Sequence, residues 1–145
     1  EDVLAQCRRL DAAGIGYNFF YLTGVSGAGR GREGAIASAE LFNRLHPRIV
    51  GSSMLTIYPN SRLYREIQAG NWREAGELEK LDELRTLISR LEIPATFAAL
   101  GASNAFNFQG RLPEDRDKLL DTLDRICRET GEQELRVYRE TLPHL

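Results

Sequence analysis

A glycine-rich segment follows the most aromatic run of the chain, and its residue types suit ligand binding. The run at 17–22 leads into a segment with glycines at positions 24, 27, 29 and 31. Glycines free the backbone and let a ligand lie against main-chain N–H groups. Arg30 and Arg32 precede an expected helix, where positive charge is unfavourable unless an anion is near. Residues 24–32 are therefore either a solvated surface loop or a ligand-facing loop.

The glycine segment matches neither of two common phosphate-binding patterns. No Gly-Lys-Ser or Gly-Lys-Thr follows it, as a Walker A loop requires. The spacing of Gly24, Gly27 and Gly29 also differs from a dinucleotide fingerprint, and the acidic residue expected after the next strand is missing. The ligand class must come from other parts of the chain.

Two further loops contain residues suited to a site. Residues 56–64 form a proline-bearing turn, which taken alone is structural more often than catalytic. Residues 101–113 place amides between aromatics, which suits a pocket lining and a loop folded over the core equally well.

The sequence lacks the conventional catalytic and metal-binding sets. His46 and His144 have no neighbouring Cys, Ser or Asp arranged as a triad would need. Cys7 and Cys127 belong to no Cys-x-x-Cys or Cys/His cluster, so both are expected to be buried free thiols. We therefore name no catalytic residue and no metal ligand.

Alternating strand and helix patterns must position these loops. The expected strands are 16–23, 49–57 and 95–100, and the expected helices are 2–13, 33–46, 62–69, 78–91 and one beginning near 113. Helix 78–91 has leucine and isoleucine on one face, with Glu and Arg assigned to its outer face. Two successive βα steps favour parallel strands, whose carboxyl ends share one edge where active sites lie in βα barrels.

The composition is that of an ordinary globular domain. The chain has 145 residues, of which 42% are hydrophobic and 28% charged, enough for one domain with a core. A net charge of −2 provides no field to attract nucleic acid or an acidic membrane. No segment resembles a membrane span or a signal peptide, so a cytoplasmic protein is expected. The first residue is Glu1 inside a helical pattern, which suggests a piece of a longer protein.

Residues 10–65 resemble the later half of a radical S-adenosylmethionine (SAM) enzyme core. The motifs of that family occur here in the same order along the chain, as Ala13-Gly14, Gly24-Val25-Ser26-Gly27, Pro47, Pro59-Asn60-Ser61-Arg62-Leu63-Tyr64 and Gly70. Farther on, Ser103-Asn104, 110–113 and 115–120 resemble the tail of a subgroup labelled Fe–S oxidoreductases.

The resemblance implies a fold and a binding site. The implied fold is α/β, with parallel βα units forming the later half of an open (β/α)6 barrel and a C-terminal helical extension. The units would occupy 1–92 and the extension 93–145, within a single structural domain. In the family, the ends of the fifth and sixth strands hold the adenosyl part of SAM. The corresponding residues here are Leu22, Thr23, Gly24, Ser26 and Gly27 beside the ribose and adenine, and Ile57 and Tyr58 near the adenine face.

The chain also departs from the family pattern. The glutamate that often follows the strand-five glycine is absent, Glu33 being the first acid beyond it, and Asn60-Ser61 replaces Gly-Thr. The CxxxCxxC motif that holds the [4Fe–4S] cluster is not in the sequence, and a cluster needs thiolate ligands. The resemblance then implies a parent oxidoreductase that cleaves SAM to a 5′-deoxyadenosyl radical. The fragment alone is expected to bind neither cluster nor SAM and to be inactive.

The expected partner is the remainder of the same barrel, together with an unidentified substrate. Uncovered apolar strands would also favour self-association of the fragment. Two alternatives stay open. One is a phosphate- or sugar-binding barrel fragment with Arg30 and Arg32 on a phosphate, and the other is a non-catalytic interaction module that docks helix 78–91 on a partner.

Overall fold

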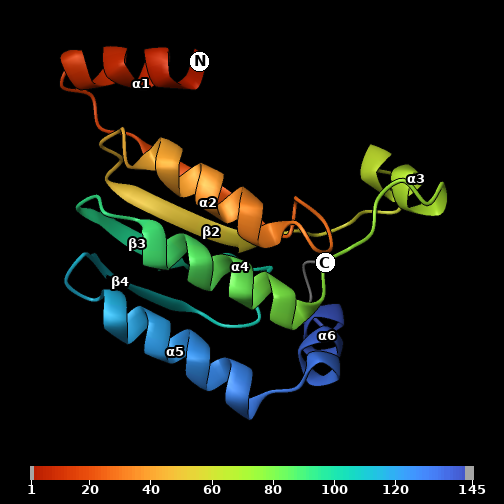
Figure 1. Ribbon diagram of the computed structural model, residues 1–145. Coiled ribbons are helices and arrows are strands. Elements are labelled where there is room, and N and C mark those ends of the chain that lie inside the picture. The colour runs from red at the N-terminus through yellow and green to blue at the C-terminus, as the bar shows by residue number, and fades with distance from the viewer. Residues whose placement is uncertain (1, 143–145) are drawn as a thin grey trace.

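A four-stranded sheet organises the chain in the computed structural model, which describes residues 2–142. The elements in chain order are α1 (Asp2–Ala12), β1 (Asn18–Thr23), α2 (Gly31–Phe42), β2 (Ile49–Met54), α3 (Arg62–Gln68), α4 (Glu77–Arg90), β3 (Ala95–Ala99), β4 (Phe108–Leu112), α5 (Arg116–Glu129) and α6 (Glu132–Glu140). The strand order is β1-β2-β3-β4 (Figure 1). The α/β class predicted from the sequence is confirmed.

The first three strands are parallel, as the two successive βα steps predict. In the register, Leu22 of β1 lies opposite Ser53 of β2, and Val50 of β2 lies opposite Phe97 of β3. The β2 strand ends at Met54, earlier than the predicted 57, because the chain turns away after Leu55 donates its N–H to Thr23 at 2.9 Å.

The sequence predicts a loop across 101–113, and this prediction is wrong for its second half. Strand β4 pairs antiparallel with β3, with Ala99 opposite Phe108 and Ala95 opposite Leu112. Leu112 is buried beneath α5, whereas Gln109 and Arg111 point outward. The strand is only five residues long, and its central Gly110 hides the alternation that would identify it.

One face of the sheet is covered by α2, α4 and α5, and the core lies between these helices and the strands (Figure 1). The predicted inner face of α2 is buried, as are most of the apolar positions predicted for α4 and α5. The buried members are Ala35, Ala39, Phe42, Leu81, Leu84, Ile88, Leu119, Leu123 and Ile126. The predicted helices and strands thus meet through the faces that their apolar spacing indicates.

The opposite face of the sheet carries no helix among the described residues (Figure 1). Its side chains include Phe20, which is 81% exposed, and the exposed Leu22, Ile49 and Leu100. The Phe20 ring leans over Gly51 of β2, where a Cβ atom would stand 3.0 Å from the ring. An apolar sheet face is therefore left open to solvent.

Helices α1 and α3 extend away from the sheet (Figure 1). The side chain of Asp11 on α1 lies 3.0 Å from the ring of His46, and Cys7 is buried. Within residues 2–142, no helix is both long and apolar enough to cross a membrane.

Candidate functional site

The ends of β1 and β2 bring the two predicted ligand-binding segments to one edge of the sheet. Thr23 pairs with Met54 at the last step of the parallel register, and its carbonyl accepts the Leu55 N–H. Residues 24–30 leave β1 there, and residues 55–58 leave β2 beside them. This is the carboxyl edge of the parallel strands, where open α/β sheets bind ligands.

The predicted site residues differ in what they present at this edge. Leu22 and Tyr58 are 42% and 56% exposed, and Ile57 is half-buried. Thr23 is fully buried with its hydroxyl 2.9 Å from the Ser52 hydroxyl, so its side chain serves the core. Ser26 is half-buried as well, so the predicted residues whose side chains are open to a ligand are Leu22, Ser26, Ile57 and Tyr58.

The glycine segment is held from beneath by carboxylates of α4. Gly24 has φ +91°, which favours glycine, and its N–H donates to Glu83 Oε2 at 2.9 Å. The N–H of Gly29 donates to Glu79, and that of Ala28 donates to the Arg73 carbonyl at 2.9 Å. These three N–H groups are bonded within the protein, so the segment is a hydrogen-bonded loop in which Val25 and Gly29 remain exposed to solvent.

Glu83 is the buried acceptor that fixes the start of this segment. Its side chain is about 1% exposed and also accepts the Tyr21 O–H at 2.5 Å. Burial raises the pKa of Glu83 above the ordinary glutamate value, while the bonds from Tyr21 and Gly24 act against that rise. Burial and the neighbouring Glu83 also raise the pKa of Tyr21. The pair therefore serves as an internal clamp between β1 and α4.

A chain of buried ion pairs continues from α4 to α6. Lys80 is fully buried, and its Nζ lies 2.7 Å from Glu74 and 3.0 Å from Glu77. Glu77 in turn accepts two bonds from Arg139 Nη1 at 2.8 and 3.1 Å. Arg139 Nη2 donates to the Leu55 carbonyl at 2.8 Å, so the network ends where β2 ends.

The assignment of Glu and Arg of helix 78–91 to its outer face is wrong for Glu83, and Lys80, which was assigned to neither face, also points inward. These side chains are buried, as is Glu77 at the first position of α4. The signal was present in the sequence, because Glu77, Lys80 and Glu83 recur every third residue alongside Leu84 and Leu87. Opposite charges on the apolar side of a helix indicate a buried ion-pair network.

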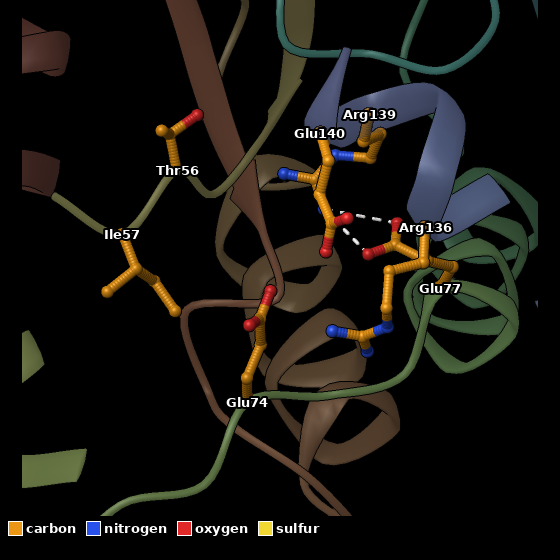
Figure 2. Close-up of a pocket in the computed structure, with 7 residues that line it drawn as sticks. All are labelled: Thr56, Ile57, Glu74, Glu77, Arg136, Arg139 and Glu140. Carbon is orange, nitrogen blue, oxygen red and sulfur yellow. Dashed lines mark hydrogen bonds and ion pairs between the residues drawn. The ribbon is translucent and has the colours of Figure 1, made fainter. Parts of the chain in front are cut away.

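A pocket of about 280 Å³ opens beside this network, between the segment after β2 and α6 (Figure 2). Its lining residues are Thr56, Ile57, Glu74, Glu77, Arg136, Arg139 and Glu140. Sequence reasoning included only Ile57 among its candidate residues, because no pattern assigned a structure to 132–145. The final residues of that range, including His144, lie outside the described residues.

A second pocket, of about 430 Å³, lies beside the glycine segment. Its lining residues are Val25, Ser26, Arg30, Glu33, Gly34, Ala37 and Trp72. Arg30 lines it without Arg32, and Glu33 adds a negative charge to the same wall. This wall therefore does not bring two arginines together around a phosphate.

Metal-binding groups can be assessed for the part of the chain that the structure describes. Within residues 2–142, no three or more His, Cys, Asp or Glu side chains gather in a way that could hold a metal ion. Cys7 is buried and Cys127 is half-buried, and both are free thiols.

Fold and site together define an α/β protein with an open, mostly parallel sheet and a charged pocket at its carboxyl edge. Comparisons with protein-family models, curated proteins and solved structures find no match to this chain.

Proposed function

We propose that this chain is the C-terminal portion of a radical SAM enzyme and contributes part of the SAM and substrate pocket. The observation that carries the proposal is that β1 and β2 end side by side, with Thr23 opposite Met54, so that residues 24–27 and 55–58 leave the same carboxyl edge of parallel strands. Leu22 and Tyr58 are exposed there, as an apolar adenine contact requires. In this proposal β1 and β2 belong to the later part of an open (β/α)6 barrel, and β3 begins the C-terminal extension at 93–145.

The distribution of helices supports the barrel interpretation. Helices α2, α4 and α5 cover only one face of the sheet, while Phe20, Leu22 and Leu100 remain exposed on the other. In a βα barrel the helices form the outer layer, and the opposite face of the strands lines the interior. The antiparallel β4 would then belong to the C-terminal extension.

The residues at this edge fit the adenosyl part of SAM in shape and polarity. Ile57 and Tyr58 offer an apolar and an aromatic surface for adenine, and Leu22, opposite Ser53 near the end of β1, offers a further apolar side chain. The N–H groups of residues 24, 25 and 27–30 all donate within the protein, so the polar groups of ribose and adenine would be bound by the remaining main-chain groups of this edge, such as its carbonyls. SAM supplies radical chemistry when a [4Fe–4S] cluster reduces it, and the proposal assigns the cluster ligands to the parent protein.

The coding sequence around this chain gives the first test. We expect the reading frame upstream of Glu1 to encode CxxxCxxC within the same polypeptide. A complete upstream reading frame without that motif would refute the radical SAM assignment.

A second test measures weak adenosyl contact with the chain itself. Since half a site gives no stable complex, the probe is 5′-deoxyadenosine, observed by saturation-transfer NMR. We expect saturation of the adenine protons, reduced by Leu22→Ala and Tyr58→Ala. Tyr64→Ala, at an exposed tyrosine on α3, serves as the matched control. Equal saturation in all four proteins would place the contact elsewhere.

The phosphate alternative is tested in parallel with inorganic phosphate. Phosphate binding that disappears in an Arg30→Ala plus Arg32→Ala variant, together with no effect of Leu22→Ala on 5′-deoxyadenosine, would favour a phosphate-binding barrel fragment instead.

A further inference from the structure

We propose that the 280 Å³ pocket between the end of β2 and α6 binds a free α-amino acid through both of its charged ends. Figure 2 shows the walls of this pocket. Thr56 and Ile57 lie on one side, Glu74 lies below, and the α6 side chains of Arg136 and Glu140 reach in from the other side. The proposal goes beyond the SAM function and shares only Ile57 with that site.

Some of the charged groups in the wall are already neutralised by neighbours. Glu77 accepts bonds from Arg139 at 2.8 and 3.1 Å and lies 3.0 Å from Lys80 Nζ. Lys80 Nζ also lies 2.7 Å from Glu74. Lys80, Glu77 and Arg139 are buried and Glu74 is half-buried, and because these groups compensate one another they form a fixed polar wall that is organised before a ligand arrives.

Two charged groups of α6 retain unused binding capacity. Arg136 Nη2 is 3.5 Å from Glu132, a marginal distance, and Glu132 is committed to the N–H groups of Glu77 and Leu78 at 2.8 and 2.9 Å. Glu140 has no ion pair within 4.0 Å among the described residues. A guanidinium and a carboxylate, one helical turn apart, thus face the same pocket (Figure 2).

This pair selects a ligand that carries both charges. The Arg136 guanidinium can donate two N–H bonds to a carboxylate, and the carboxylates of Glu140 and Glu74 can accept from an ammonium group. An anion without an ammonium would leave Glu140 uncompensated, and a cation without a carboxylate would leave Arg136 with only its 3.5 Å contact to Glu132. The class that satisfies both requirements is a small zwitterion.

The size of the pocket and its apolar wall narrow the class further. A volume of about 280 Å³ equals that of roughly nine liquid waters at about 30 Å³ each. That space is sufficient for one amino acid of moderate size. Ile57 supplies an apolar contact for an aliphatic side chain.

The test titrates the 145-residue chain with L-leucine and follows backbone amide resonances by NMR. We expect shifts concentrated at Thr56, Ile57 and α6. The single-charge analogues L-leucinamide and N-acetyl-L-leucine are each expected to bind about tenfold more weakly, because each leaves one charged group of the pocket unpaired. Equal binding of the two analogues and L-leucine, or no shifts at about 10 mM L-leucine, would overturn the proposal.

Matched variants identify the residues responsible. Arg136→Gln and Glu140→Gln are expected to weaken L-leucine binding about tenfold, whereas Arg128→Gln and Glu129→Gln, the corresponding changes on α5, leave it unchanged. The amide spectra of the unliganded variants verify that each one folds. Equal loss in both pairs of variants would overturn the assignment to this pocket.

Separate titrations with 5′-deoxyadenosine and SAM distinguish this pocket from the SAM site proposed at the carboxyl edge, because SAM also carries an amino-acid end. The shifts from 5′-deoxyadenosine are expected at 22–27 and 57–58 and not on α6. If SAM shifts the α6 resonances while L-leucine does not, the pocket belongs to SAM and a free amino acid is refuted. L-leucine binding without any 5′-deoxyadenosine effect leaves the pocket standing and removes the weak adenosyl contact expected at the carboxyl edge.

Discussion

The fully buried Lys80 provides the sharpest test of how α4 supports the carboxyl edge. Its Nζ compensates Glu74 and Glu77, and its alkyl stem packs against Gly24. Lys80→Met retains most of the side-chain volume but leaves Glu77 dependent on Arg139 alone. Removing one partner from a buried ion pair costs about 3–5 kcal/mol. Because Arg139 still compensates Glu77, we expect Lys80→Met to lower the free energy of unfolding by about 3 kcal/mol.

The measurement is urea unfolding followed by circular dichroism, with the slope m compared between proteins. Arg85→Met on the same helix is the control, since the side chains of the Arg85–Asp124 pair are 43% and 36% exposed and a surface pair of this kind is worth at most about 1 kcal/mol. We also expect Glu77→Gln added to Lys80→Met to be less destabilising than the sum of the two changes, because the residues share one network. A Lys80→Met loss no larger than that of Arg85→Met, at equal m, would refute the reasoning.

Three further predictions concern titration, helix capping and the open sheet face. Burial raises the folded-state pKa of Glu83, so the contribution of Glu83 to the free energy of unfolding is most favourable at acid pH and is lost as the pH rises above about 4.5. The stability of Glu83→Gln relative to wild type should therefore increase from about pH 4.5 to 8. A difference in urea unfolding that does not change with pH would contradict this. Burial acts to raise the pKa of Glu132, but the hydrogen bonds from the Leu78 and Glu77 N–H groups outweigh burial, so the pKa is lowered. Glu132→Ala should therefore lower the free energy of unfolding by about 1 kcal/mol at pH 7, and by less as the pH falls below 4.5. Phe20→Asp should reduce self-association in sedimentation velocity, whereas an equal effect of Asp at the exposed Val3 would show that the open sheet face is not responsible.

The parts of the fold that could be predicted are those with long apolar periodicity. The α2 and α4 faces were identifiable because Ala35, Ala39, Leu81 and Leu84 recur at helical spacing, and the βα order then indicated parallel pairing of β1 and β2. Strand β4 lacked such a signal, since five residues with a central glycine fit a loop equally well. Its position depends on α5, which covers it, and that contact is not encoded locally.

The candidate site likewise has one part that the sequence predicts, the carboxyl edge, and one part that it does not, the pocket beside α6. Placing Leu22 and Ile57 at one edge requires only parallel strands and short connections. The pocket requires Arg139 to reach across from α6 to Glu77, 62 positions away in the chain, and to the Leu55 carbonyl. No local pattern reports such a contact, and a lysine within a leucine-rich helix is more often solvated than buried.

The buried network gives the two proposed binding regions a common support. Glu83 fixes the N–H of Gly24, and Lys80 fills the space beneath Gly24, where a Cβ atom would stand 3.2 Å from Lys80 Cε. The same lysine holds Glu77, which orients Arg139 in the pocket wall. A change in Lys80 would therefore move both the start of the glycine segment and the amino-acid pocket. Since all these atoms lie on α4 or touch it, α4 determines the geometry of the carboxyl edge more than the glycines themselves do.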